Sequence, residues 1–311
     1  MAFWDALVHP SLSIVGDSFA FLGWLGVPVF VFLSGFGLER KYSSIQTVAP
    51  KKFLQYNYRK LIVLLLPAVL FYIVYFVASH NWTSVISSIL SLSLLGNIWH
   101  LILPLDPSIY WYFGLTWELY IFFLLQKTII KNERKRNINM IVWTIVGVVW
   151  MVLAYLLFPD NSHPLEWVRR NFIGWVPVFF AGICVADSNG NFRLHQNSFI
   201  LLIESIFILF LISVSNLSFY TWLIVPFLAL FFFAVIGQVC FNVKFLRTAF
   251  LWIGNLSSYL FVCHPIARGI THKILEGHFS IMVASYLVLS FLLAISFKYV
   301  KSRVERRKAL L

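Results

Sequence analysis

Apolar runs long enough to cross a lipid bilayer recur along the whole chain. Most contain roughly 17 to 25 residues, the length an α-helix needs to cross a hydrocarbon core of about 30 Å. The runs expected to be spans are residues 2–15, 19–38, 60–78, 108–126, 138–158, 172–187, 198–214, 219–237, 249–267 and 281–299. The sequence therefore predicts an all-α polytopic integral membrane bundle of about ten transmembrane helices, organised as a single domain over residues 1–311.

The composition agrees with a membrane protein and excludes a soluble fold. Hydrophobic residues make up 60% of the chain and charged residues only 12%, and the mean hydropathy is +0.84. An ordinary globular domain carries about 25% charged residues. Many of the 12 Trp and 13 Tyr residues lie at the ends of apolar runs, where amphipathic rings anchor a helix at the headgroup level.

The formal net charge of +12 would raise the question of nucleic acid in a soluble protein. Here the basic residues cluster in short connections between apolar runs, so they are explained by orientation in the bilayer, and no nucleic-acid partner is expected. A disulfide framework and a metal site are not expected either, because the cysteines show no CxxC or Cys/His spacing. The cysteines are Cys184, Cys240 and Cys263.

The distribution of basic residues predicts the orientation of the chain. Basic clusters lie in residues 40–60 and 127–136 and in a C-terminal tail, residues 300–311, which positive-inside bias places in the cytoplasm. A further crossing at residues 84–103 would put the later clusters on the opposite side, so this segment is expected to stay on the outer side. The protein is thus expected in the plasma or inner membrane with both termini cytoplasmic. The basic residues of the outer connections are Arg169, Arg170, Arg268 and Lys273.

Four ionisable side chains fall within the predicted spans, where each costs a few kcal/mol and is a functional hypothesis by default. These are His9, Glu118, Glu204 and His264. Glu118 lies about 14 Å into its span, close to the midplane. His9 has the side chain best matched to proton transfer near neutral pH. Structural roles remain as alternatives: a carboxylate paired with a hydroxyl or backbone group, or a histidine at the interface.

The basic connection at residues 40–60 has three possible explanations. Positive charge here is an orientation signal, a contact with anionic lipid, or a docking site for the phosphates of a cytoplasmic nucleotide-containing donor. The sequence leaves all three open, because any membrane protein of this kind carries positive charge on its inner side.

Several segments in a fixed order resemble signatures of the acyltransferase 3 family of membrane-bound acyltransferases. Val27–Phe36 resembles "FFxLSGF", and Trp111–Tyr120 is similar to "WSLxxExxFY". Ile253–Pro265 resembles "GxxSYxxYLxHxP", and Phe179–Gly182 is similar to a shorter "FxxG" feature. The basic entry Tyr58-Arg59-Lys60, followed by apolar residues to Pro67, resembles "RxxRxxP". The resemblance covers nearly the whole chain.

The resemblance implies transfer of an acyl group, acetyl or succinyl, from cytoplasmic acyl-CoA to a hydroxyl of a cell-envelope glycan or glycolipid. Acyl-CoA is then a co-substrate, and no bound cofactor is expected. His9 matches the essential histidine of the first span, and Glu118 is expected to orient its imidazole. The residues expected to bind the phosphates of acyl-CoA are Arg59, Lys60, Lys51 and Lys52. The side chains expected to line the pocket are Ser34, Trp111, Tyr112, Trp117 and His264.

Two departures from the family pattern leave alternatives open. The family's arginine eleven residues before the essential histidine has no counterpart, because that position would precede Met1, so the first span is expected to be truncated. Leu61 and Leu64 stand where the "RxxR" spacing would place arginines. The alternatives to an active acyltransferase are a catalytically inactive relative, or a glycan or lipid transporter of similar architecture, although no inverted repeat is visible.

Overall fold

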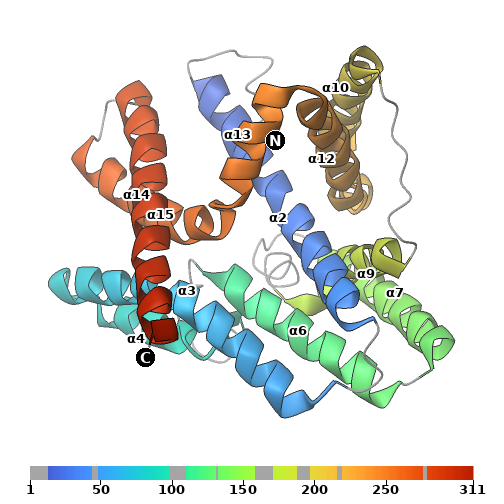
Figure 1. Ribbon diagram of the computed structural model, residues 1–311. Helices are drawn as coiled ribbons and strands as arrows, with labels where there is room; N and C mark the ends of the chain where they lie inside the picture. The colour runs from blue at the N-terminus through green and yellow to red at the C-terminus, as the bar shows by residue number, and fades with distance from the viewer. Residues whose placement is uncertain are drawn as a thin grey trace. The chain divides into compact units, whose positions relative to one another are not determined.

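The computed structural model describes residues 13–43, 48–97, 110–130, 132–157, 171–187, 197–215, 219–275 and 279–310. Within these ranges the regular secondary structure is helical throughout, which confirms the all-α fold. The helices are α2 (Ser13–Tyr42), α3 (Pro50–Ala78), α4 (Trp82–Ser91), α6 (Trp111–Ile129), α7 (Glu133–Leu157), α9 (Phe172–Asp187), α10 (Ser198–Ser215), α11 (Phe219–Trp222), α12 (Val225–Asn242), α13 (Lys244–Gly254), α14 (Ser257–Ile274) and α15 (Phe279–Leu310) (Figure 1).

Several of these helices are long and apolar enough to cross a membrane, as a polytopic protein requires. Five pass this test among the described residues, and α13 with α14 would make a sixth if the pair is one broken span. Their outer surfaces are apolar: on α10, Phe199, Ile206 and Phe207 are 69%, 61% and 59% exposed. Only hydrocarbon solvates such a surface favourably. The polytopic membrane fold is confirmed, and a total of about ten crossings stays a prediction.

Three predicted boundaries are wrong, each for a local reason. The span predicted at 219–237 starts later, because Pro226 in the first turn marks the beginning of α12, a position where its missing N–H costs nothing. The span predicted at 249–267 is broken between Gly254 and Ser257, where the helices bend by 69°. The break expected near residue 17 is absent, because α2 is continuous from Ser13. The span predicted at 2–15 lies mostly outside the described residues.

Segments expected to be loops or tails are partly helical. Pro50 begins α3, so the basic residues from Lys51 to Lys60 lie on a helix and not in a connection. At the other end of the chain, α15 continues to Leu310, so the basic tail extends a helix. The apolar segment at 84–103 contains α4, which has 10 residues and is too short to cross a bilayer.

The chain divides into two compact units, each built from two separate stretches. The first unit comprises Met1–Phe53 and Glu118–Arg247, and the second comprises Leu54–Trp117 and Thr248–Leu311. The boundaries between the units fall inside α3, α6 and α13.

In the first unit, glycines bring α9 close to two other helices. A Cβ on Gly35 of α2 would collide with the carbonyl oxygen of Phe179 on α9, and a Cβ on Gly182 of α9 would collide with that of Phe32 on α2. A Cβ on Gly147 of α7 would likewise collide with the carbonyl oxygen of Ile173 on α9. Small residues that allow close backbone approach are the usual basis of helix packing in membranes.

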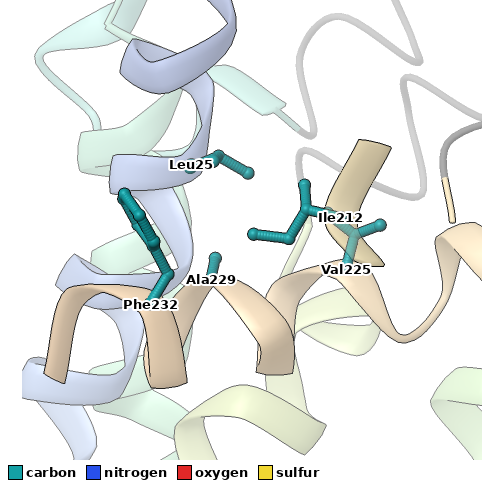
Figure 2. Close-up of a cluster of buried hydrophobic side chains, with 5 residues drawn as sticks. All are labelled: Leu25, Ile212, Val225, Ala229 and Phe232. Atoms are coloured by element: carbon teal, nitrogen blue, oxygen red, sulfur yellow. The ribbon is translucent and has the colours of Figure 1, made fainter. Parts of the chain in front are cut away.

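A cluster of apolar side chains joins α10 and α12 to α2 in the same unit. Leu25 of α2 faces Phe232 and Ala229 of α12, and Ile212 of α10 packs beside Val225 (Figure 2). All but Phe232 are fully buried. Leu25 lies nearer the beginning of α2 than Gly35 does. The earlier part of α2 therefore packs against α12, and the later part packs against α9.

In the second unit, polar contacts accompany aromatic packing. The Tyr110 hydroxyl, just before α6, donates a hydrogen bond to the Val262 carbonyl of α14 at 3.1 Å. Asn97 donates through its side-chain amide to the Trp111 carbonyl at 3.2 Å. The Tyr58 hydroxyl of α3 donates to the Leu92 carbonyl at 3.0 Å. Of the three acceptors, the Leu92 carbonyl lies at the C-terminal end of α4, where helix carbonyls lack an intrahelical partner.

The close contact between α2 and α9 generates a prediction. Gly35→Ala and Gly182→Ala should each destabilise the protein by about 1 to 3 kcal/mol, because the added methyl group forces the two backbones apart. The matched control is Gly37→Ala on the same helix, since a Cβ at Gly37 would meet nothing within 4 Å. Thermal unfolding of the detergent-solubilised protein measures both; equal melting temperatures for Gly35→Ala and Gly37→Ala would contradict the packing.

Candidate functional site

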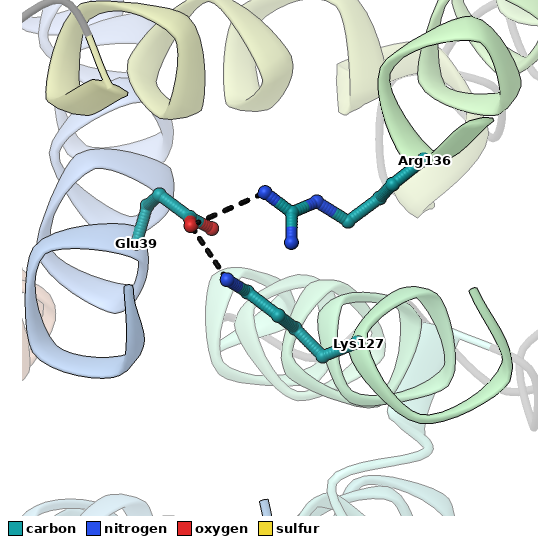
Figure 3. Close-up of polar contacts among 3 residues, drawn as sticks. All are labelled: Glu39, Lys127 and Arg136. Atoms are coloured by element: carbon teal, nitrogen blue, oxygen red, sulfur yellow. Dashed lines mark hydrogen bonds and ion pairs between the residues drawn. The ribbon is translucent and has the colours of Figure 1, made fainter. Parts of the chain in front are cut away.

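A buried cluster of three charged side chains joins α2, α6 and α7 in the first unit. Glu39 of α2 accepts from the Lys127 ammonium at 2.6 Å and from the Arg136 guanidinium at 3.3 Å (Figure 3). Both cations use the same oxygen, Oε1, and all three side chains are at least nine-tenths buried. The other oxygen, Oε2, is buried without a hydrogen-bond partner among the described residues. The cluster carries one negative and two positive charges, and its geometry makes Glu39 the central residue.

Sequence analysis did not identify Glu39 as a site residue. The signal was an acid near the end of a long apolar segment, Ser13–Tyr42, where an ionisable group needs a partner. The partners could not be found, because Lys127 and Arg136 are far away in sequence and each lies in a cluster of like charges. Nearby, Asn139 of α7 donates to the Gln126 side-chain carbonyl of α6 at 2.7 Å, so a second polar contact fixes the same helix pair.

Glu118 is buried and lies against the beginning of α9. Its Oε2 accepts a hydrogen bond from the Phe172 backbone N–H, the first residue of α9, at 2.9 Å. The Asn171 side chain accepts from the Ile173 N–H at 3.0 Å, which satisfies another N–H of this helix end. A carboxylate is favoured there because the first turn of a helix has unpaired N–H groups and a positive dipole end. The structural alternative for Glu118, a backbone partner, is therefore present in the first unit.

Two other ionisable residues of the predicted spans have different outcomes. His9 lies outside the described residues, so its predicted proximity to Glu118 stays a prediction. Glu204 lies on α10, half-buried, and makes no hydrogen bond or ion pair within the part of the chain that the structure describes.

The four residues expected to bind the donor's phosphates all lie on α3. Lys51, Lys52, Arg59 and Lys60 are exposed, which leaves their charged groups accessible. From Lys51 to Lys60 the helix rises about 14 Å, and Lys52 and Arg59 point in nearly the same direction because seven residues make almost two turns. The first three turns of α3 thus carry these four cations, here called the cationic row, in which Lys52 and Arg59 share one side of the helix and Lys51 and Lys60 point away from each other.

The residues expected to line a pocket are divided between the two units, so their forming one pocket stays a prediction. In the first unit, the Ser34 hydroxyl donates to the Phe30 carbonyl of its own helix at 2.9 Å. In the second unit, the Tyr112 ring lies 5.0 Å from that of Phe261, which lies 5.7 Å from the imidazole of His264. The structure therefore brings Tyr112 and His264 together through a shared aromatic neighbour.

The other two expected pocket residues lie on α6 of the second unit. The Trp117 ring packs edge-on against Tyr58 at 5.6 Å, beside the cationic row of α3. The Trp111 ring packs edge-on against its neighbour Tyr112 at 6.2 Å. The His264 Nδ1 lies 3.2 Å from the Leu260 carbonyl of its own helix, so this histidine is engaged locally. Within the ranges described, no group of His, Cys, Asp and Glu residues could hold a metal ion.

Comparison with known proteins gives one match. A family model described as an acyltransferase domain matches residues 2–299, essentially the whole chain. No curated protein and no solved structure matches the chain.

The charge cluster generates a prediction about stability. Glu39→Gln should destabilise the protein by about 3 kcal/mol or more, because it leaves two buried cations without a counter-charge. The exposed neighbour Arg40 offers the control, and Arg40→Gln should change stability by no more than about 1 kcal/mol. Thermal unfolding in detergent measures the difference.

A triple variant tests the physical reason. Replacing Glu39, Lys127 and Arg136 together by Met should restore most of the stability that Glu39→Gln loses, because no uncompensated charge remains. A triple variant less stable than Glu39→Gln would show that the ion pairs themselves, and not the unpaired cations, determine the loss.

Proposed function

Because the chain belongs to the acyltransferase family whose model spans residues 2–299, and is a membrane acyltransferase, we propose that it transfers an acetyl or succinyl group from acyl-CoA to a hydroxyl group. The acceptor is a glycan or glycolipid of the cell envelope. The family match is the observation that carries the proposal, and the apolar helices agree with a reaction at a membrane.

The proposed reaction needs one proton acceptor. The imidazole of His9 removes the proton of the acceptor hydroxyl, whose oxygen forms a bond to the thioester carbonyl carbon. The C–S bond then breaks, and the departing thiolate of coenzyme A takes up the proton from the imidazolium. The products are an ester and free coenzyme A, so atoms and charge balance without a metal or bound cofactor.

Glu118 is proposed to position the imidazole and stabilise its protonated form. Its burial supports this role, because the attraction between a carboxylate and an imidazolium is stronger away from water. Its hydrogen bond from the Phe172 N–H fixes one oxygen at the start of α9, which restricts the orientation of the carboxylate. A positioned carboxylate of this kind is the usual third group of a nucleophile and base pair.

The cationic row on α3 is proposed to bind the phosphates of acyl-CoA. Arg59 can bind one phosphate through two parallel N–H groups, while Lys51, Lys52 and Lys60 act as point charges. Their exposure supports the proposal, since a soluble donor must reach them from water. In the proposed orientation, the beginning of α3 and both chain termini lie on the cytoplasmic side of a plasma or inner membrane.

The catalytic proposal predicts the effect of two substitutions. His9→Ala should lower acyl transfer by about 10²-fold or more, because a positioned general base contributes that much. Glu118→Gln keeps an oxygen that can accept from the Phe172 N–H but removes the charge, so it should lower transfer without unfolding the protein. The assay follows label from acetyl-CoA into extracted envelope glycan with purified, membrane-reconstituted protein.

The control for these variants is His80→Asn. His80 lies in a turn with a positive φ of 56°, a conformation that Asn adopts readily. The substitution should therefore leave acyl transfer unchanged. Wild-type transfer retained by His9→Ala would remove that residue from the mechanism. Movement of the acceptor across the membrane without acylation would instead indicate a transporter. A wild-type protein that neither acylates nor moves the acceptor would be an inactive relative.

The donor-site proposal predicts a change in KM. Replacing Lys51, Lys52, Arg59 and Lys60 together by Gln should raise the KM for acyl-CoA at least about tenfold, because each charge-assisted hydrogen bond contributes about 1.5 kcal/mol or more. The control replaces Lys244 and Arg247, exposed cations of α13, by Gln. An unchanged donor KM in the α3 variant would reject the assignment.

A further inference from the structure

An open groove in the second unit lies between α3 and α14. Its volume is about 730 Å³, within the range of sites that bind small molecules. One wall is aromatic and comes from α3: Phe71, Tyr72, Tyr75 and Phe76. The other wall comes from α14 and contains Arg268, His272 and Lys273. None of the residues that the acyl-transfer proposal uses lines this groove.

The basic residues of the groove lie close together on α14, between Arg268 and Lys273. Arg268 and His272 are one helical turn apart and share one side of the helix, and Lys273, about 100° further round, also lines the groove. All three are exposed. The Lys273 ammonium lies 5.5 Å from the centre of the Tyr75 ring, a cation–π contact that brings positive charge onto the aromatic wall.

Gly269 lies in the same wall of the groove, next to Arg268 in the sequence. A Cβ at Gly269 would meet nothing within 4 Å, although the residue lines the groove and lies in the interior of α14. Glycine in a helix interior lowers stability by roughly 0.5 to 1 kcal/mol relative to alanine. Because the space beside Gly269 is open, helix packing does not require a glycine there. The space above Gly269 is therefore available to a ligand.

The charges are not explained by helix stability or orientation alone. His272 and Lys273 lie in the last turn, where cations compensate the helix dipole, but Arg268 lies more than a turn earlier. Arg268 and Lys273 are also two of the few basic residues in the predicted outer connections, where the positive-inside bias does not call for them. Aromatic and cationic walls together match a ligand that has an apolar part and a negative charge.

We propose that this groove binds an anionic phospholipid of the bilayer. The guanidinium of Arg268 binds the phosphate through paired N–H groups, and Lys273 adds a second positive charge. The acyl chains lie along the aromatic wall of α3, which lipid chains can reach because the groove is open. This site is independent of the acyl-transfer proposal, since the two share no residue.

The test measures lipid retention by native mass spectrometry of the full-length protein in detergent. Phosphatidylglycerol should bind at least tenfold more tightly than phosphatidylcholine with the same acyl chains. Replacing Arg268 and Lys273 together by Gln should remove this preference. The control replaces Lys301 and Arg303, which contact Tyr259 and Tyr299 outside the groove, and should keep it.

A second variant leaves the charges in place. Gly269→Leu fills the open space and should weaken phosphatidylglycerol binding at least tenfold, whereas Gly237→Leu, at another open helical glycine, should not. Unchanged binding in both Gly269→Leu and the charge variant, at wild-type melting temperature, would overturn the proposal. Displacement of the lipid by millimolar inorganic phosphate would also overturn it, because the site would then select the anion and not the lipid.

Discussion

Close backbone contact at three glycines determines how the first unit packs. Inside a bilayer, side chains gain little by leaving lipid for a helix interface, so helices associate where their backbones can approach closely. Gly35 and Gly182 provide this contact between α2 and α9, and Gly147 provides it between α7 and α9. The first two belong to segments that resemble family signatures, which gives those signatures a packing role. With α9 placed in this way, its first N–H lies within hydrogen-bonding distance of Glu118.

Two buried carboxylates connect helices of the first unit, Glu118 between α6 and α9 and Glu39 between α2, α6 and α7. Glu118 accepts from the beginning of α9, and Glu39 accepts from Lys127 and Arg136. A charge away from water needs such partners: Glu118 has a backbone N–H, and Glu39 has two cations. A structural partner for Glu118 is compatible with a role in catalysis, because a group that positions a base must itself be positioned. The proposed lipid groove belongs to the other unit and needs neither acid.

Much of the secondary structure could be predicted, since hydrophobic length is a local property. Apolar runs identified the spans that became α7, α10 and α15. The errors occurred where a single residue changes the path of the chain, as at Pro226 and Gly254. Glu39 was missed because its charge pairing joins residues from three helices, whereas its neighbours in the sequence are Arg40 and Lys41. The groove was missed for the same reason: its aromatic and cationic walls are almost two hundred positions apart in the chain.

The sequence by itself determined that this protein is an all-α membrane protein of the acyltransferase family, because length, hydropathy and motif order are written along the chain. Only the tertiary structure decided which buried charges meet, which glycines face a neighbouring backbone, and where an open cationic groove lies. These depend on the distance between residues remote in sequence. Such distances follow from helix packing. Hydropathy gives no direction to that packing in helices such as α2 and α15, around which it is nearly uniform.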